Sequence, residues 1–595
     1  MPELNFQRIV LMGLIFFAPL LVIPSVLDDG FETPKAALIL AGVLLCIAAT
    51  CIKWFRNQEV SKSTSVTPGI ILLLFAINAL TFFYTENPYY TKAAVILNVG
   101  SLLVFIFVYQ NADECLSVWF FIALAVSGVI VAVLTIFQAA DHFILFESNT
   151  PGSVITSTIG NSNTLGVFLI FPSIVLMGIW FIVEGKVRWI VCAFLVVVLA
   201  AVMIARARAS WIGLGGATIL FVLLMSKIHN VSLLRFAPFP RRKVIYGTIA
   251  IIIVLGASLC LIPKRGRPGL TLENITDQTS FNLRKKYWQA SWHLWAGKSP
   301  VLGTGLWSYR NLVYDSQAEL ELKKPGFFAD YDNPKPRRVH NEYLEILNDG
   351  GVIAACALLL FICVVMGHGY QVIQDDSLNK NARVVSATAF ATVSGIMVTA
   401  IFFFTFRISI TLFMTSMMLG IMEGIYIRSY RLLGRCRGSV FLSGHVMLPI
   451  VLAVLAATFW YGGYRPVKGE WEHRKFKISL AKKARNEAEK HLLNALSLDP
   501  QNTVYCFDAA CFYMVTKVDL PLSKKYLSRS LVFFNGDVER WTIHYLNGVL
   551  SGRLGNTVAA SKEFEKAVYY NPVYEPAIKE LQQVKDYLKK VSIAG

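Results

Sequence analysis

The chain is poor in charged residues. Only 16% of its 595 residues are Asp, Glu, Lys or Arg, whereas soluble domains carry about 25%. Apolar residues make up 55% of the chain, and the mean hydropathy is +0.53. This composition excludes an ordinary soluble protein and indicates a chain that lies mostly within a membrane.

The ten cysteines are scattered, and no pair has the spacing of metal ligands, so we expect small core residues and no metal site. The chain also lacks the features of a cleavable leader at its first apolar run, 9–27. That run is long, contains Pro19, has no small-x-small cleavage site and leads into another apolar run. We therefore interpret it as a membrane span.

Apolar runs that approach the ~20 residues of a bilayer helix recur along most of the chain. They predict an all-α, polytopic membrane protein with about 12–13 transmembrane helices. The thirteen runs are 9–27, 36–51, 69–83, 93–109, 116–137, 164–181, 189–204, 210–224, 244–262, 351–366, 384–404, 408–425 and 440–461.

A formal net charge of +18 would suggest a nucleic-acid partner in a soluble protein. Here the basic residues gather in alternate short loops, and the positive-inside rule explains them without nucleic acid. With the N-terminus inside, the long loop 263–350 and the C-terminal region fall outside. We expect a multi-pass protein of the bacterial cytoplasmic membrane with these two regions extracytoplasmic.

The chain changes character near Lys468, where polar residues and a repeated pattern return. Segments 488–500 (AEKHLLNALSLDP) and 559–572 (AASKEFEKAVYYNP) end in Asp-Pro and Asn-Pro, 72 residues apart, and 521–534 (PLSKKYLSRSLVFF) lies between them. The spacing is about two units of 34 and resembles a tetratricopeptide array. The predicted domains are thus a membrane domain, 1–465, and a tetratricopeptide-like α-solenoid, 470–595, that offers a site for a protein partner.

Several cationic or titratable side chains fall at the predicted outer face. A guanidinium within a bilayer costs about 2.5–3.5 kcal/mol on insertion scales, so it usually has a partner or a function. Each candidate also has a purely structural explanation. Arg206 and Arg208 could anchor their helices at the membrane interface, Arg407 could lie in a turn, and Lys35 could mark the start of a helix. His340 could be an ordinary surface histidine. The candidates are Lys35, Arg206, Arg208, Arg284, His340 and Arg407.

These residue types suit a phosphate-bearing substrate at a membrane surface. Planar guanidinium groups bind phosphate oxygens in pairs and stabilise the charge that grows on a departing pyrophosphate. Histidine is a suitable base for an acceptor hydroxyl, and nearby arginines would lower its pKa and keep the ring neutral. Because pyrophosphate already leaves readily, we expect neither a metal nor another cofactor.

Four segments resemble motifs of the O-antigen ligase and polymerase family. They are GNSNTLGVFL (160–169), ARASWIGL (207–214), FNLRKKYWQASWHLWAGKSPVLGTGLWSY (281–309) and RRVHNEYLEILNDGG (337–351). The resemblance implies a helical membrane fold of the GT-C class, with Arg208 and Arg284 on the lipid pyrophosphate and His340 activating the acceptor. Two positions depart from the family pattern: Ala207 replaces a serine, and Glu342 stands where another histidine or polar residue is usual.

The resulting hypothesis is a glycosyltransferase that moves a glycan from undecaprenyl pyrophosphate to an acceptor hydroxyl. Arg206, Arg407 and Lys35 would be secondary phosphate contacts, Asn341 would orient the histidine, and Glu342 would support it. Lipid A core would make it an O-antigen ligase, a growing glycan a repeat-unit polymerase, and a Ser or Thr side chain a protein O-oligosaccharyltransferase. A lipid-linked glycan transporter and a membrane-anchored scaffold are alternatives of another class, although no paired broken spans suggest a transporter.

Overall fold

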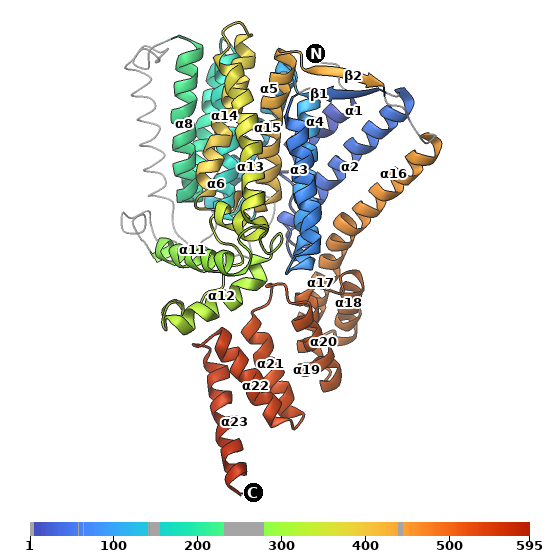
Figure 1. Cartoon of the computed structure of the whole chain (residues 1–595), viewed down its shortest axis with the longest axis vertical. Helices are drawn as coiled ribbons and strands as arrows, with labels where there is room; N and C mark the ends of the chain where they lie inside the picture. The colour runs from blue at the N-terminus through green and yellow to red at the C-terminus, as the bar shows by residue number, and fades with distance from the viewer. Residues whose placement is uncertain are drawn as a thin grey trace. The chain divides into compact units, whose positions relative to one another are not determined.

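The computed structural model describes residues 5–57, 59–63, 65–140, 142, 155–230, 279–437 and 444–594, which are almost entirely helical (Figure 1). The chain divides into two compact units. Unit 1 comprises Met1–Ala76, Ile96–Asp277 and Ala357–Tyr464, and unit 2 comprises Ile77–Val95, Gln278–Cys356 and Arg465–Gly595. Much of the predicted outer loop therefore groups with the C-terminal residues.

Unit 1 contains most of the apolar helices. Three helices, α3 (Thr67–Leu80), α4 (Pro88–Asn111) and α13 (Glu342–Gln374), have one part in each unit. The helices wholly within unit 1 are α1 (Phe6–Phe17), α2 (Glu32–Asn57), α5 (Glu114–Ala139), α6 (Ser162–Ile182), α7 (Val187–Ala205), α8 (Arg208–Ile228), α14 (Lys380–Ala400), α15 (Ser409–Ser429) and α16 (Gly444–Phe459), with the short turns η4 (Thr405–Arg407) and η5 (Trp460–Tyr464).

Ten helices in the described residues are long and apolar enough to cross a membrane, as expected for a polytopic membrane protein. Of the thirteen predicted runs, 244–262 lies outside the described residues. The run 69–83 is not among the ten either, because α3 has only 14 residues. The prediction of a full span at 9–27 is wrong, because α1 has only 12 residues and ends at Phe17. A helix of that length rises about 18 Å, well short of a bilayer core, and Pro19 and Pro24 follow it.

Helix α6 is largely buried within unit 1 and contacts α5, α7, α8, α14 and α15. Small residues allow these close approaches, as is usual between membrane helices. A β-carbon built at Gly166 of α6 would lie 2.6 Å from the Ala207 β-carbon and 2.7 Å from Ser210 Oγ. Glycine in GNSNTLGVFL and the small residues of ARASWIGL therefore bring the starts of α6 and α8 together.

The contact between α8 and α14 depends on a second pair of glycines. A β-carbon at Gly213 would lie 2.0 Å from Thr399 Oγ1 and 2.6 Å from Gly395 O, and one at Gly395 would lie 2.7 Å from the Ala217 β-carbon. The backbones of the two helices can approach this closely only because both positions lack side chains.

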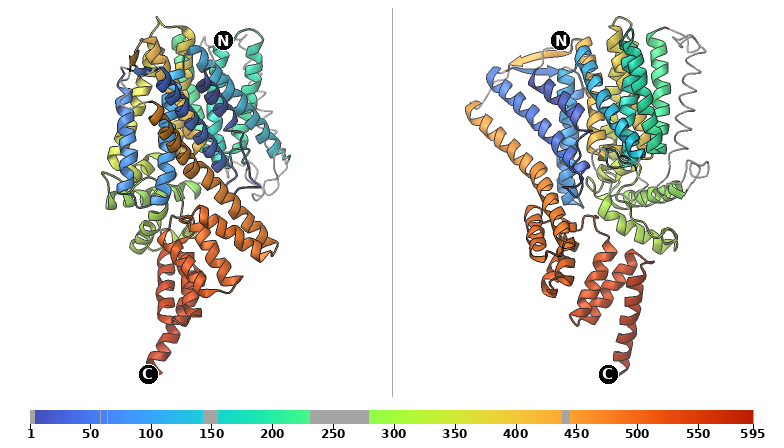
Figure 2. Two further views of the ribbon diagram at one scale, coloured as in Figure 1. Left: turned by 90° about the vertical axis from the view of Figure 1, so that its right-hand side faces the viewer. Right: turned by 180° about the vertical axis from the view of Figure 1, so that it is seen from behind.

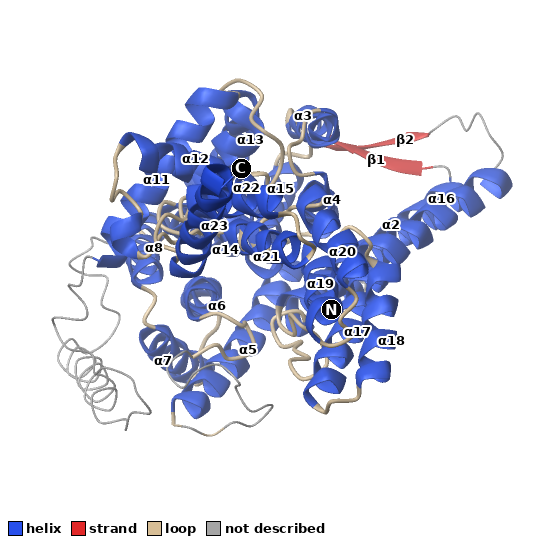
Figure 3. Ribbon diagram, turned by 90° about the horizontal axis from the view of Figure 1, so that it is seen from below, coloured by secondary structure: helices blue, strands red, loops and turns tan. Residues whose placement is uncertain are grey.

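The only strands in the described residues are β1 (Glu59–Ser63) and β2 (Leu433–Arg437), which pair antiparallel (Figure 3). Their register sets Glu59 opposite Arg437 and Ser63 opposite Leu433. Within unit 1 this pairing joins the segment that follows α2 to the segment that follows α15.

Unit 2 contains the described outer-loop helices α11 (Thr279–Lys298) and α12 (Tyr309–Lys323), with the short turns η1 (Thr81–Phe83) and η3 (Ala329–Tyr331). Its C-terminal helices form the successive pairs α17–α18, α19–α20 and α21–α22, followed by α23 (Figure 2). Their bounds are Arg465–Ala481, Arg485–Leu498, Thr503–Val515, Leu520–Val532, Arg540–Arg553, Thr557–Tyr570 and Glu575–Ala594. The three predicted repeats fall on the second helix of each pair.

Local sequence explains where these helices begin and end. The backbone N–H of Asp499, at the end of α18, donates to Ala495 O, and Pro500 then prevents the helix from continuing. Asn502 caps the next helix, since its Oδ1 accepts from the N–H groups of Val504 and Tyr505. The Asp-Pro ending is thus a turn between two helices, as the repeat pattern predicts.

We predict that Gly213→Ala destabilises unit 1, because its new methyl group would overlap Thr399 Oγ1 and the Gly395 carbonyl. Overpacking of this kind typically costs about 1–3 kcal/mol. Gly215→Ala, on the same helix with open space around the β-carbon, is the matched control and should be neutral or slightly stabilising. Thermal unfolding of the purified protein in detergent measures both, and equal melting temperatures would contradict the packing argument.

We also predict that the α21–α22 pair loosens in acid. Burial raises the pKa of Glu563, but hydrogen bonds from His544 (2.8 Å) and Lys566 (2.8 Å) outweigh it and lower that pKa to about 2. A depressed carboxyl pKa contributes stability that is present above its unfolded value, near 4.5, and is lost as pH falls through the folded value. Hydrogen exchange of α21 and α22, corrected for intrinsic rates, should accelerate between pH 5 and pH 2, and Glu563→Gln should remove most of this pH dependence.

Candidate functional site

One end of unit 1 collects the basic candidates at helix boundaries. Lys35 is in the first turn of α2, Arg206 ends α7 with a left-handed φ of 55°, Arg208 begins α8, and Arg407 ends the short turn before α15. The close contact of Gly166 with Ala207 joins the starts of α6 and α8. Ser409 N donates to Glu32 Oε1 at 2.6 Å, which joins the starts of α2 and α15.

Lys35 has a structural explanation that the sequence did not reveal. Its side chain is fully buried, and Nζ donates to the carbonyls of Leu21 (2.9 Å), Phe31 (2.8 Å) and Thr158 (2.7 Å). An ammonium group has three N–H donors, and all three are used. The expected phosphate contact of Lys35 is therefore disfavoured, because a phosphate would have to displace one of these carbonyls.

The other basic candidates of unit 1 differ in exposure. Arg206 and Arg208 are exposed, whereas Arg407 is only 8% exposed. Asn161, from the GNSNTLGVFL motif, caps α6 by accepting hydrogen bonds from Asn163 N and Thr164 N. This motif thus has a folding role in starting α6.

His340 lies in unit 2, in the turn of residues 337–341 that immediately precedes α13. Its backbone has a φ of 57°, in the left-handed region that non-glycine residues seldom adopt. The imidazole stacks on Tyr287 of α11, with 6.2 Å between ring centroids and 24° between ring planes. Arg284 lies one helical turn before Tyr287, so α11 carries both an aromatic and a cationic neighbour of the histidine.

Burial lowers the pKa of His340 to about 4, and the Arg284 charge lowers it further, while Glu345 partly opposes both effects. The pKa of Tyr287 is raised to about 12, again mainly by burial, although Arg284 acts against this rise. Both rings are therefore neutral at pH 7. A neutral imidazole can accept a proton, which is the state that a general base requires.

Glu345 is the most informative neighbour that the sequence analysis missed. Its carboxylate is fully buried, accepts from Arg338 Nη1 (3.2 Å) and from Val339 N (3.1 Å), and lies one turn into α13. The Arg338 guanidinium also lies over the Trp307 ring, 4.3 Å from its centroid. The two residues directly before His340 are therefore fixed by one buried carboxylate.

Asn341 and Glu342, which were expected to orient and support His340, lie at the start of α13. The Asn341 side chain accepts a hydrogen bond from Leu344 N at 3.1 Å, which makes it the N-cap of α13. It thus fixes the helix start next to His340. Glu342 is completely buried at the first position of that helix.

A backbone junction supports α13 a few residues further along. The helix is interrupted at Gly351, where φ is 61° and a β-carbon would lie 2.1 Å from Val301 O. Segment 300–307 packs against this break through hydrogen bonds. Thr304 N donates to Asn348 O (2.7 Å), and Val352 N donates to Pro300 O (3.0 Å). Gly305 N donates to the backbone carbonyl of Asp349 (2.9 Å), and Trp307 N donates to the Asp349 side chain (3.0 Å). The Pro-x-x-Gly-x-Gly motif and the Asp-Gly-Gly sequence are thus two sides of one contact.

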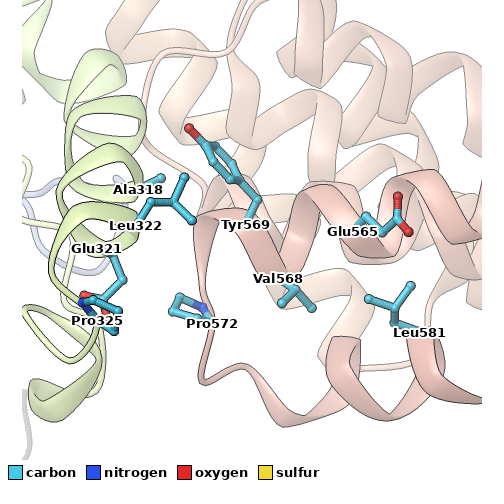
Figure 4. Close-up of a pocket in the computed structure, with 9 residues that line it drawn as sticks. All are labelled: Ala318, Glu321, Leu322, Pro325, Glu565, Val568, Tyr569, Pro572 and Leu581. Carbon is cyan, nitrogen blue, oxygen red and sulfur yellow. The ribbon is translucent and has the colours of Figure 1, made fainter.

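A pocket of about 450 Å³ lies in unit 2 between α12 and the helices α22 and α23 (Figure 4). Its walls include Leu322, Val568 and Tyr569, and neither His340 nor Arg284 lines it. The carboxylate of Glu321, at its edge, already accepts from the backbone N–H groups of Gly326 and Phe328. The pocket is therefore separate from the candidate site and offers mainly apolar walls.

The predicted site residues fall into two groups, one in each unit. Lys35, Arg206, Arg208 and Arg407 belong to unit 1, and Arg284, His340, Asn341 and Glu342 belong to unit 2. Chemically, the second group combines a neutral imidazole with a guanidinium charge, as a base and an anion-binding group would require.

Comparison with known proteins bears on what these groups do. Residues 193–362 match the sequence model of the O-antigen ligase family. The matched range contains Arg206, Arg208, Arg284, His340, Asn341 and Glu342, but neither Lys35 nor Arg407. A search of curated proteins found no match to the chain. The family match supports a ligase-type or polymerase-type function on lipid-linked glycans, in a chain with ten candidate membrane helices in its described part.

Proposed function

We propose that the protein transfers a preassembled glycan from undecaprenyl pyrophosphate to an acceptor hydroxyl at the outer face of the cytoplasmic membrane. His340 takes the proton of the acceptor hydroxyl as that oxygen attacks the anomeric carbon. The bond from this carbon to the pyrophosphate oxygen breaks, and the electron pair leaves with the lipid pyrophosphate. Direct displacement of this kind inverts the configuration of the sugar.

The position of the His340 ring, stacked on Tyr287 of α11 one helical turn from Arg284, is the observation that carries this proposal. A base must be unprotonated when the acceptor binds, and the lowered pKa of the half-buried ring beside Arg284 agrees with that condition at pH 7. The imidazole stacks on the Tyr287 ring, and the buried Glu345 carboxylate holds the backbone of Val339, the residue directly before the histidine. An ordinary surface histidine would have neither the depressed pKa nor this enclosure.

Arg208 and Arg284 are assigned to the donor pyrophosphate. Guanidinium groups hold phosphate oxygens in pairs and remain charged at any physiological pH. Their charge also stabilises the leaving pyrophosphate. Arg206 and Arg407 are secondary candidates for the same ligand, and Lys35 is left out because three backbone carbonyls occupy its ammonium group.

The C-terminal helices are assigned to the handling of an acceptor or of a partner protein. Helical-hairpin arrays present extended surfaces to peptides and seldom carry chemistry themselves. In this assignment the helices α17–α23 form a tetratricopeptide-like domain that lies outside the membrane with the outer loop.

Transfer with purified components tests the proposal. The detergent-solubilised protein is given a lipid-linked glycan and, in separate reactions, lipid A core, a growing glycan chain or a Ser/Thr-containing acceptor protein. Product with one acceptor assigns it as ligase, polymerase or protein transferase, and activity should persist in EDTA. Absence of transfer to all three acceptors, together with movement of intact donor across liposomes, would favour a transporter instead.

For His340, we predict that His340→Gln lowers the transfer rate by about 100-fold or more, because glutamine keeps a polar side chain but cannot act as a base. His293→Gln on α11, whose ring pairs with the exposed Glu319 at 3.2 Å, is the matched control and should keep near-normal activity. In the unchanged protein the rate should hold down to about pH 5 and fall as pH drops through about 4, where His340 becomes protonated.

The Glu345→Gln variant tests the sign of that pH dependence. The Glu345 charge raises the pKa of His340, so its removal should move the acid limb of the rate profile to lower pH. An acid limb near pH 6.5 in the unchanged protein would contradict the assignment of His340 as a buried base.

For the arginines, we predict that Arg284→Ala and Arg208→Ala raise the donor KM and also lower kcat, since each removes charge that binds and stabilises pyrophosphate. Lysine at either position should restore activity only in part, because it lacks the two-pronged geometry. Lys285→Ala is the matched control for Arg284: it removes an adjacent, exposed positive charge on the same helix. Equal effects of Lys285→Ala and Arg284→Ala would indicate a diffuse electrostatic effect in place of a specific contact.

A further inference from the structure

Asp537 lies between α20 and α21, and its carboxylate contacts three residues from other parts of unit 2. Arg310 of α12 donates to Oδ1, and the hydroxyl of Tyr90, near the start of α4, donates to Oδ2. Arg337, in the 337–341 turn, lies 3.7 Å from Oδ1 and donates to the Asp537 backbone carbonyl at 2.9 Å. One residue of the C-terminal helices thus touches α4, α12 and the turn that carries His340.

This contact is enclosed, which makes its loss costly. The side chains of Asp537 and Arg310 are 10% and 9% exposed, and the Arg310 guanidinium lies over the Tyr90 ring at 3.9 Å. A buried carboxylate keeps its charge only when cationic or hydrogen-bonding partners replace water, and removing it leaves the partner cation without compensation. Asp537 is therefore more than a surface contact between neighbouring helices.

The connection from Asp537 to His340 is short. Arg337 is followed by Arg338, which pairs with Glu345, and then by Val339, whose N–H donates to the same carboxylate. Val339 is fully buried in an apolar cluster that also contains Phe534, Trp541 and Tyr570 of the C-terminal region. The turn is thus held at Arg337 by Asp537 and at Val339 by side chains of the same region.

Other contacts show that this docking is extensive. A β-carbon at Gly536 would lie 2.3 Å from Arg310 O, so the segment before Asp537 packs directly on the backbone of α12. Arg540 Nη1 donates to both carboxylate oxygens of Asp315 at 3.1 Å, and Asn333 Nδ2 donates to Tyr570 O at 2.9 Å. These contacts keep the segment that bears Asp537 in register with the outer loop.

We infer that Asp537 is a positioning residue for His340, so that the C-terminal helices form part of the support of the proposed base. This inference rests on the proposed function for its kinetic consequence, but its structural part can be measured separately. It differs from a role in acceptor capture, because a positioning contact acts on the turn of residues 337–341 before any acceptor binds.

Asp499 supplies a matched control. Its Oδ2 accepts from the Tyr89 hydroxyl at 2.6 Å, so it too is a carboxylate that joins the C-terminal helices to the start of α4. The contacts described for it reach Tyr89 and Asn502, and none involves Arg310 or Arg337. Asp537→Asn and Asp499→Asn therefore each remove a carboxylate that binds a tyrosine at the start of α4. Only Asp537 also contacts Arg337, in the turn that carries His340.

The first measurement is hydrogen exchange of the full-length protein in detergent, without substrate. Asp537→Asn should accelerate exchange of the peptide that spans 335–345 several-fold, and Asp499→Asn should leave that peptide unchanged. Unchanged exchange of the peptide in Asp537→Asn would overturn the inference, whatever the activity of the protein. Thermal unfolding of each variant shows whether the effect is local or reflects general loss of structure.

The second measurement is steady-state transfer. Asp537→Asn should lower kcat about tenfold with little change in donor KM, and Asp499→Asn should stay within about twofold of the unchanged protein. In Asp537→Asn the acid limb of the rate profile should also move to higher pH, toward the ordinary pKa of histidine, as the His340 ring becomes more exposed to water. Faster exchange with normal kcat and an unmoved acid limb would overturn the positioning role.

A double variant identifies the route of the effect. If Asp537 acts through Arg337, Arg337→Gln combined with Asp537→Asn should cost no more in kcat than Asp537→Asn alone. Independent, additive losses would overturn that route. Full activity of His340→Gln would instead refute the proposed function. The hydrogen-exchange result would still show whether Asp537 holds the turn of residues 337–341, because it is measured without substrate.

Discussion

A polar or charged group that leaves water is stabilised by partners within the protein, and three buried charged residues of this chain show how those partners are supplied. The ammonium of Lys35 meets three carbonyls, and the Glu345 carboxylate meets one guanidinium and one backbone N–H. Glu423 of α15, 1% exposed, accepts from Ser65 and Thr67 and pairs with His368 at 2.7 Å. Lys35 and Glu423 join segments that are distant in sequence, whereas Glu345 fixes the turn directly before its own helix. Contacts of the first kind give helices with mostly apolar surfaces defined neighbours.

The helices could be predicted from the sequence because the signal is local and additive: some twenty apolar residues in succession are a property of one segment. The prediction failed at 9–27, where hydropathy continued past Phe17 but the backbone did not remain helical near Pro19 and Pro24. Helical pairs at the C-terminus were also visible, since the Asp-Pro and Asn-Pro endings mark turns by local chemistry.

The site could be predicted less well from the sequence, because the hydrogen-bond and ionic partners of a side chain can lie far away along the chain. Nothing near Lys35 reveals that Thr158 O, 123 residues away, accepts from its ammonium group. The depressed pKa of His340 was expected from arginines alone, whereas burial is the larger cause and Arg284 the second. Glu345 was given no role in the sequence analysis, although its charge and its spacing of five residues from His340 could have marked it as a neighbour of the turn.

The junction between segment 300–307 and the break in α13 has a consequence for how such chains can change over time. Most of its hydrogen bonds join backbone atoms, for example Val352 N to Pro300 O and Thr304 N to Asn348 O, although Trp307 N donates to the Asp349 side chain. They therefore depend on chain length more than on side-chain identity. Surface loops usually accept inserted residues at small entropic cost. Here one inserted residue on either side would shift every bond of the junction, so related chains should vary in length within the outer loop only away from 300–307 and 348–353.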